Sequence, residues 1–363
     1  MVKLTTPEYI ASLKPYKPGK PLEELEREYG ISDSIKLASN ENPLGPSPKA
    51  LKAIRGALGN LHRYPDGSGF KLKRKISEKF KVDSAQVVLG NGSDEIIGML
   101  TRAFLQPGDE VVLPAPSFLM YAIMVRSAGA VPVHVPLKAL SLDLEGMKSR
   151  ITSKTRMIFI CNPNNPTGTF ISDKDFRGFL ESIPQELLLV VDEAYIEFVR
   201  GVEAVSSIEY LKGGRRLVTL RTFSKAYGLA GLRIGFGVML PEVADLLNRV
   251  RQPFNANSLA QTGALAALDD ADFFEKTLKL VHSGLDFLYH SLDKMGIEHF
   301  PSQTNFFLIN VRQNADVVFE AMLKQGVIVR SMTEYGFPEF IRINVGLPAE
   351  NDRFLKALAK VLG

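Results

Sequence analysis

The residues with the most reactive chemistry in a short space lie between positions 221 and 235, in the segment RTFSKAYGLAGLRIG. A single lysine, Lys225, stands there among small residues, with hydroxyl side chains at Thr222 and Ser224 and a guanidinium at Arg233. A surface loop has no need of so many small residues around one lysine. The lysine amine is the side chain that attacks a carbonyl to form an imine. This segment could therefore carry covalent chemistry on a carbonyl compound.

Two further segments place polar residues where an apolar run ends. Residues 190–195, VVDEAY, end such a run on Asp192, a carboxylate that is costly to bury unless it meets a cation or a strong donor. Residues 90–95, GNGSDE, open a helical pattern whose free N–H groups and positive dipole end suit a phosphate. Taken alone, the first segment is also compatible with an ordinary strand end, and the second with a turn capped by Ser93 or Asp94.

The remaining motif is a turn. Residues 162–168, NPNNPTG, contain two prolines and a glycine, which by themselves indicate only a rigid turn. A dinucleotide fingerprint in the neighbouring glycine-rich segment would need a third glycine where Glu95 stands, so the pattern argues against a nicotinamide cofactor. All of these segments follow apolar runs, and open α/β sheets bind ligands at the ends of their strands.

Short apolar runs and amphipathic stretches alternate between about residue 45 and residue 250. Several runs are apolar throughout, which is typical of strands covered on both faces. The alternation predicts an α/β domain with a largely parallel sheet. Strands are expected at 86–90, 110–114, 131–135, 156–161, 187–192, 217–222 and 234–239, and helices at 69–81, 94–106, 117–128, 172–182 and 242–251.

The pattern changes after Asn255, where long helical stretches are followed by fewer strands. This favours a smaller α+β domain. Near the other end, residues 14–21 read KPYKPGKP, and their prolines fix φ and stop regular structure. We expect that segment to be an arm that crosses to the small domain. The expected elements after Asn255 are 258–268, 271–295, 305–310, 316–325, 340–345 and a helix from Pro348.

Composition excludes several classes of protein. Of the 363 residues, 45% are hydrophobic and 23% charged, as in an ordinary soluble globular protein, and the net charge is only +4. The densest basic run, 71–75, lies in a helical pattern and indicates a solvated face rather than a nucleic-acid site. The single cysteine, Cys161, excludes an internal disulfide and a multi-cysteine metal site. With neither a signal-peptide core at its start nor an apolar run of membrane-spanning length, the chain is expected to be cytoplasmic.

The segments 164–168 (NNPTG), 192–195 (DEAY) and 224–233 (SKAYGLAGLR), in that order, closely resemble the fold type I pyridoxal-phosphate enzymes of the aminotransferase class. The resemblance covers nearly the whole chain. It implies a large domain with a mainly parallel seven-stranded sheet, a small domain made from both termini, and a homodimer. We therefore expect an N-terminal arm with part of the small domain at 1–41, the cofactor-binding domain at 42–252 and the small domain at 253–363.

Carried over residue by residue, the resemblance implies roles around pyridoxal phosphate. Lys225 resembles the lysine that forms the Schiff base, and Asp192 resembles the carboxylate that faces the pyridine nitrogen. Tyr195 and Asn165 resemble the donors to the ring hydroxyl, and Phe118 stands where the family stacks an aromatic ring. Many relatives use tyrosine or tryptophan at that position, so stacking is expected without a hydroxyl contact.

The cofactor phosphate would be held by one guanidinium, by hydroxyls and by helix-terminal amides. Tyr64, in HRYPDG at 62–67, resembles the tyrosine that reaches the cofactor phosphate of the neighbouring subunit. The other phosphate-binding residues implied are Arg233, Thr222, Ser224, Ser93, Asp94 and Glu95.

The physical requirements of the cofactor agree with these roles. The pyridine ring withdraws electrons well only while its nitrogen is protonated, which gives the buried Asp192 a reason to be there. The freed amine of Lys225 can shuttle a proton between carbons. Other fates of the same carbanion stay open, because a pyridoxal-phosphate lyase or decarboxylase would use the same residues.

Three N-terminal segments narrow the resemblance. Residues 14–21, 37–45 (LASNENPLG) and 62–67 resemble the branch that transaminates histidinol phosphate. Relatives that act on aromatic amino acids share these segments, and a branch that decarboxylates threonine phosphate is close in fold. Both remain alternatives.

The expected substrates, histidinol phosphate and 2-oxoglutarate, both carry an anion. The resemblance matches Arg342 to the substrate-anion arginine of the small domain, and Arg330 could converge on the same anion. Arginine suits phosphate and carboxylate alike, because its planar fork pairs two oxygens at once. Asn165 and Tyr16 are further candidates for the substrate pocket. Arg330 is also compatible with a surface charge, and Tyr16 with packing by the arm.

Overall fold

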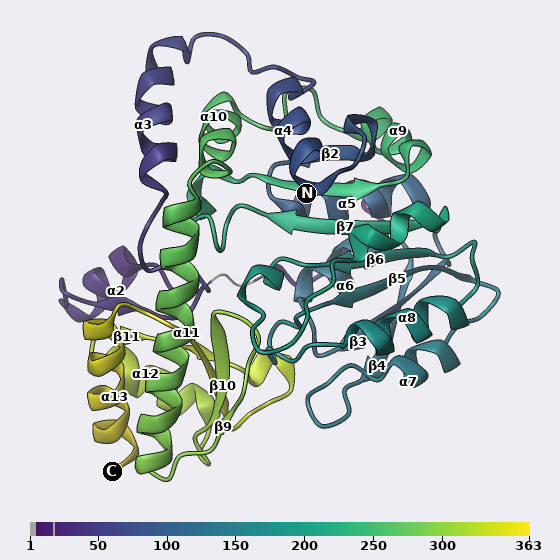
Figure 1. Cartoon of the computed structure of the whole chain (residues 1–363). Coiled ribbons are helices and arrows are strands. Elements are labelled where there is room, and N and C mark those ends of the chain that lie inside the picture. The colour runs from purple at the N-terminus through teal and green to yellow at the C-terminus, as the bar shows by residue number, and fades with distance from the viewer. Residues whose placement is uncertain (1–4, 17–18) are drawn as a thin grey trace.

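The computed structural model describes residues 5–16 and 19–363. Its largest element is a seven-stranded sheet of order β2-β8-β7-β6-β5-β3-β4 (Figure 1). All neighbouring pairs from β7 to β4 are parallel, whereas β8 is antiparallel to both β7 and β2. The expected α/β class and mainly parallel sheet are thus confirmed. The strands are β2 (Val87–Gly90), β3 (Glu110–Ala115), β4 (Val131–Pro136), β5 (Thr155–Cys161), β6 (Leu188–Asp192), β7 (Leu217–Thr222) and β8 (Gly235–Met239).

The central strands are apolar throughout because both of their faces are covered. In β5, Ile158 and Ile160 belong to one core cluster, whereas Met157 and Phe159 belong to a second cluster on the opposite face. Side chains alternate between the faces of a strand, so both sets are buried only when helices lie on both sides. These helices are α4 (Phe70–Phe80), α5 (Ser93–Phe104), α6 (Leu119–Ser127), α7 (Leu144–Ser149), α8 (Asp173–Ser182) and α9 (Pro241–Val250).

A second, four-stranded sheet has the order β12-β13-β10-β9 and is antiparallel. It is accompanied by three helices, of which the long α11 runs from the region of the large sheet down to the small one (Figure 1). This arrangement matches the expected α+β pattern. The elements are β9 (His299–Phe300), β10 (Phe306–Asn310), β12 (Arg330–Ser331), β13 (Phe340–Asn344), α11 (Ala271–Lys294), α12 (Ala315–Leu323) and α13 (Pro348–Leu362).

The N-terminal part of the chain joins this second unit. β1 (Ile35–Lys36) pairs in parallel with β11 (Val327–Ile328), and α2 (Leu22–Tyr29) buries Leu25 against residues of the C-terminal elements. Figure 1 accordingly shows α2 beside the yellow C-terminal helices. The N-terminal segment and the C-terminal elements therefore pack together in one unit.

The predicted domain boundary at residues 252 and 253 stays a prediction. α10 (Ser258–Ala267), which follows it, packs against α3 (Pro48–Ala57) and α4. α3 is an addition to the expected helices. Ser47 caps it by accepting a hydrogen bond from the Ala50 N–H, and Pro48 occupies its first turn, where its missing N–H costs nothing.

Some expectations fall on undescribed residues of the N-terminal arm, and others concern membrane helices, metal sites and the single cysteine. Residues 1–4 and the pair Lys17-Pro18 of the proline-rich segment lie outside the described residues. Within 5–16 and 19–363, no helix is both long and apolar enough to cross a bilayer, and no group of metal-binding side chains gathers. Cys161 is a buried, free thiol at the end of β5, and its Sγ donates to the Pro163 carbonyl.

Candidate active site

A cavity of about 380 Å³ opens at the carboxyl ends of β5, β6 and β7. Parallel strands end at the same edge of a sheet, so segments far apart in sequence meet there. The motif residues of 162–168, 192–195 and 221–235 all reach this edge. The residues singled out from the sequence that line the cavity are Ser93, Asp94, Phe118, Asn165, Asp192, Tyr195, Thr222, Ser224, Lys225 and Arg233.

Lys225 lies in the loop that follows β7. Its Nζ donates a hydrogen bond to the Ser39 carbonyl (3.2 Å) and lies 5.7 Å from the centre of the Tyr195 ring. Burial, and next the positive charge of Arg342, lower the pKa of the Lys225 amine to about 8. Relative to an ordinary lysine, this raises the neutral fraction at pH 7 by roughly 300-fold. The amine is therefore poised as a nucleophile or base.

Asp192, the last residue of β6, is only 4% exposed. Its Oδ2 accepts a hydrogen bond from the Tyr121 hydroxyl (2.7 Å), and its Oδ1 accepts one from the Ala194 N–H (3.1 Å). Burial raises the pKa of the Asp192 carboxyl to about 6, although the Tyr121 hydrogen bond opposes the shift. A buried carboxylate held only by neutral donors would be stabilised by a cation facing it.

Tyr121 contacts Asp192, and the sequence motifs do not indicate this residue. It is fully buried on α6, stacked on Phe159 with ring centres 4.7 Å apart, and it meets Phe118 edge-on at 5.5 Å. The available signal was its spacing of three residues after Phe118, which places two side chains on one face of a helix. Tyr121 thus supports both the aromatic residue of the cavity and Asp192.

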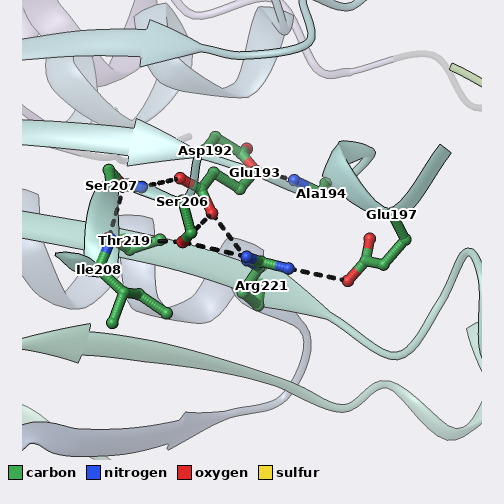
Figure 2. Close-up of polar contacts among 9 residues, drawn as sticks. All are labelled: Asp192, Glu193, Ala194, Glu197, Ser206, Ser207, Ile208, Thr219 and Arg221. Atoms are coloured by element: carbon green, nitrogen blue, oxygen red, sulfur yellow. Dashed lines mark hydrogen bonds and ion pairs between the residues drawn. The ribbon is translucent and has the colours of Figure 1, made fainter. Parts of the chain in front are cut away.

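A buried ion-pair network lies directly behind the ends of β6 and β7 (Figure 2). Arg221 pairs with Glu193 (2.8 Å) and with Glu197 (3.1 Å). Glu193 also accepts hydrogen bonds from the Ser206 hydroxyl and the Ser207 N–H. Because each buried charge has a partner, the network can hold the two strand ends in a fixed relation. Asp192 is adjacent to Glu193 and Thr222 is adjacent to Arg221, so the network helps to position both cavity residues.

One end of the cavity is built for an anion. Arg233 adopts a left-handed φ of 56°, and its Nη1 lies 3.5 Å from the Ser224 hydroxyl. Gly92 precedes α5 and has a φ of 79°, a backbone conformation that L side chains rarely adopt, and a Cβ there would also crowd the Arg233 guanidinium. The first turn of α5, which begins at Ser93, has free backbone N–H groups that suit an anion.

The two acidic side chains at the start of α5 lie in different surroundings. Asp94 lines the cavity 3.6 Å from Arg233, and burial raises the pKa of its carboxyl. The Glu95 carboxylate does not line the cavity. It accepts hydrogen bonds from the Asn91 N–H and the Asn255 side chain, each at 2.6 Å. The Glu95 side chain is therefore a loop support, and only its backbone amide remains a candidate contact for an anion.

A smaller cavity of about 110 Å³ adjoins the first and shares Lys225 with it. Arg330 and Arg342 line it and lie opposite each other across the β12–β13 pair, so their side chains share one face. Arg342 donates to Asn165 Oδ1 (2.5 Å) and to the Ala38 carbonyl (3.0 Å), whereas Arg330 pairs with Glu334 (3.2 Å). The expected convergence of the two arginines is thus present.

The two tyrosines expected from the N-terminal third lie in different places. Tyr16 lines the smaller cavity, with its ring edge-on to Phe118 at 6.5 Å. Tyr64 lines neither cavity of its own chain. Its side chain is 82% exposed and stacks on Phe254, with ring centres 4.6 Å apart. A role for Tyr64 in catalysis would therefore have to be played in another copy of the chain.

Pyridoxal phosphate fits the residues that are present. The buried Asp192 carboxylate suits a protonated ring nitrogen, and Arg233 with Ser224 and the start of α5 suits the phosphate. Lys225 supplies an amine between these two ends. The cavity is also lined by Ser39 and Glu41, which belong to the segment 37–45 but were not singled out individually.

The chain is similar to known aminotransferases over nearly its whole length. The family model of class I and II aminotransferases matches residues 32–358. Histidinol-phosphate aminotransferase of Desulfotalea psychrophila is 52% identical over 99% of this chain and 96% of its own length. Histidinol-phosphate aminotransferase 2 of Pseudomonas aeruginosa is 49% identical, with coverages of 97% and 96%.

A solved structure shows the same fold. Histidinol-phosphate aminotransferase from Sinorhizobium meliloti, crystallised with pyridoxal-5'-phosphate, superposes with a TM-score of 0.89 at 27% identity, covering 100% of this chain and 98% of its own. The geometry of the cavity, the family model and these relatives agree. The chain belongs to the class I and II aminotransferase family.

Proposed function

We propose that this chain is a pyridoxal-phosphate-dependent aminotransferase that transfers the amino group of histidinol phosphate to 2-oxoglutarate in histidine biosynthesis. The names of relatives about half identical over nearly the whole chain support the amino donor. The observation that carries the proposal is the pair Arg330 and Arg342, side by side in a cavity that also contains Lys225. A single buried cysteine agrees with a cytoplasmic location.

Different residues of the chain have different roles in the reaction. When bound, pyridoxal phosphate supplies an aldehyde for the substrate amine and a ring that accepts the electron pair released at the substrate carbon. Asp192 would stabilise a positive charge at the ring nitrogen, and Arg233 would hold the phosphate. Lys225 Nζ then removes the proton from the carbon that carries the amine. The donor and the acceptor use the same cavity in turn, in a ping-pong sequence.

The anion pocket must accept both substrates of this sequence. Histidinol phosphate carries a phosphomethyl group where an amino acid has its carboxylate, and 2-oxoglutarate brings a carboxylate to the same place. Two guanidinium groups on one face suit a dianion better than a monoanion, because each can pair with separate oxygens. Arg342 is the inner partner, since it also contacts Asn165 of the first cavity.

We expect histidinol phosphate to exceed unphosphorylated histidinol in kcat/KM by at least about a hundredfold, because histidinol lacks the phosphate group that Arg342 and Arg330 would bind. Phenylalanine should lie between them, since its carboxylate satisfies the arginines in part. Arg330→Ala should lower kcat/KM for histidinol phosphate by about tenfold to a hundredfold and that for phenylalanine less. The measurement is steady-state kinetics with 2-oxoglutarate.

Arg249→Ala is the matched control for this experiment, because Arg249 forms only an exposed pair with Asp245 on α9. It should leave all three amines unaffected. Equal use of histidinol and histidinol phosphate would reject the proposed donor. A higher value for phenylalanine would favour an aromatic aminotransferase, and release of carbon dioxide without amino transfer would favour a decarboxylase.

We propose in addition that the active form is a homodimer with shared sites. Besides Tyr64, large apolar side chains are exposed at the end of α3, at the start of α4 and in the loop before α10. Exposed apolar side chains of this size favour coverage by a protein surface, and a second copy of the chain would also bring Tyr64 to a cavity. The apolar residues are Leu58, Leu61, Phe70 and Phe254.

Mixing two inactive variants tests this arrangement. After subunit exchange between Tyr64→Ala and Lys225→Ala, each hybrid dimer should carry both lesions in one site and leave the other site intact. The activity should therefore exceed the sum of the two parents, approaching half of the wild-type value per hybrid. Wild type mixed with Lys225→Ala provides the reference for exchange. A mixture that exchanges subunits yet regains nothing would show that Tyr64 acts within its own chain or not at all.

A further inference from the structure

The segment of residues 37–41, which we call the strap, is hydrogen-bonded to the small sheet and to a loop at the edge of the large sheet. On the small sheet, the Asn344 N–H donates to the Leu37 carbonyl (2.9 Å) and Arg342 donates to the Ala38 carbonyl (3.0 Å). In the loop that follows β7 of the large sheet, Lys225 Nζ donates to the Ser39 carbonyl (3.2 Å). The strap therefore links the substrate-anion arginine to the lysine of the cavity.

Asn40 is the strap residue whose side chain reaches furthest into the site. It is 2% exposed and has a left-handed φ of 55°, which asparagine tolerates better than most residues. The backbone N–H of Asn40 donates to Asn344 Oδ1 (3.0 Å), and its carbonyl accepts from Asn305 Nδ2 (3.1 Å). Its side-chain Nδ2 donates to the Tyr195 hydroxyl (3.0 Å). The small domain thus holds the backbone of Asn40, and its side-chain amide contacts Tyr195, which follows β6 of the large sheet.

The Asn40 contact decides where the proton of Tyr195 can point. A phenol has one proton to donate and can accept hydrogen bonds at its oxygen. Because Asn40 donates to that oxygen, the Tyr195 proton must be directed to another acceptor. The Tyr195 side chain lines the cavity with Lys225 and Asn165. Burial is the main cause that raises the pKa of this phenol, and it is opposed by Arg342 and by the Asn40 hydrogen bond.

We propose that Asn40 is a positioning residue that directs the Tyr195 proton toward the ring oxygen of the bound cofactor. The inference rests on the proposed function, because that ring oxygen belongs to pyridoxal phosphate. Donation to the ring oxygen stabilises its negative charge and so makes the neighbouring imine nitrogen less basic. Asn40 therefore influences the pH at which this nitrogen loses its proton and the absorbance of the bound cofactor changes.

The test is a pH titration of the absorbance of the cofactor-loaded protein. Asn40→Gly removes the amide and keeps the left-handed backbone at no steric cost. Since a hydrogen bond contributes about 1 kcal/mol, the midpoint should rise by about half a unit to one unit. Tyr195→Phe, which removes the donor altogether, should raise it further. Asn42→Gly is the matched control, because Asn42 lies next to the strap and donates to Ala226 and Thr277 instead.

A double variant separates positioning from a general structural effect. If Asn40 acts through Tyr195, the double variant should have the same midpoint of the absorbance titration as Tyr195→Phe alone. A shift of equal size in both backgrounds would overturn the proposal. A lowered midpoint in Asn40→Gly would also overturn it, because the tyrosine would then have been donating to the amide.

The same titration distinguishes failure of the inference from failure of the proposed function. If wild-type protein given pyridoxal phosphate develops no lysine-dependent absorbance band, the proposed function fails whatever Asn40 does. If wild type and Tyr195→Phe titrate as expected and Asn40→Gly does not move, the inference alone fails. Circular dichroism of each cofactor-free variant checks that the fold is retained.

Discussion

Lys225→Ala should lower the turnover number by at least about 10⁴-fold, because one side chain serves as both nucleophile and proton carrier. The variant should still hold pyridoxal phosphate, since Arg233, Ser224 and the start of α5 bind the phosphate without the lysine. Its absorbance should match free rather than imine-linked cofactor. The measurements are single-turnover kinetics with histidinol phosphate and an absorbance spectrum after gel filtration.

Chemical labelling provides the control for this result. Borohydride reduction of the wild-type holoenzyme fixes the cofactor on the lysine that carries it, and peptide mapping then identifies that residue. Lys36→Ala is a suitable matched variant, because Lys36 pairs with Glu41 beside the cavity without lining it. Label on any lysine other than Lys225 would contradict the assignment, as would substantial turnover by Lys225→Ala.

Asp192→Asn should lower the turnover number on the order of a thousandfold, because a neutral amide cannot hold a positive charge on the ring nitrogen. Tyr121→Phe should have a smaller effect in the same direction, since it removes one hydrogen bond to the Asp192 carboxylate and keeps the carboxylate itself. The measurement is kcat and KM for both variants. Near-normal transamination by Asp192→Asn would show that this carboxylate does not serve the ring.

The same substitution should have the opposite effect on the stability of the cofactor-free protein. The pKa of Asp192 is raised from 3.8 to about 6, so the folded state binds the proton more tightly than the unfolded state does. Stability of the wild type therefore falls as pH rises from about 4 to about 6. Above pH 6 the ionised carboxylate costs at most about 3 kcal/mol.

Asp192→Asn removes this cost, so the cofactor-free variant should be more stable than wild type above pH 6 and similar to it near pH 4. Urea unfolding at the two pH values measures the difference. Asp245→Asn is the control, because that carboxylate is exposed on α9 and far less enclosed than Asp192. Equal stability differences between variant and wild type at both pH values would contradict the raised pKa of the buried Asp192 carboxyl.

The sequence by itself determined the elements of the large sheet to within a residue or two. Strands such as β5 and β6 are apolar at every position because both faces are covered, and that pattern is local. The motifs around Lys225, Asp192 and Asn165 also follow strand ends, and parallel strands end at one edge. The composition of the cavity could therefore be predicted without coordinates, from these strand-end motifs and from the family resemblance that they carry.

Other contacts of the site were decided only by the tertiary structure. Arg330 and Arg342 share a face because of the register of β12 on β13, and that register depends on packing of the whole small sheet. Tyr121 meets Asp192 across 71 positions of sequence, and Asn40 meets Tyr195 across 155. No local pattern encodes such pairings, because each depends on how separate elements pack together. The sequence thus determined which chemical groups the site contains, and the packing determined which of them hold one another in place.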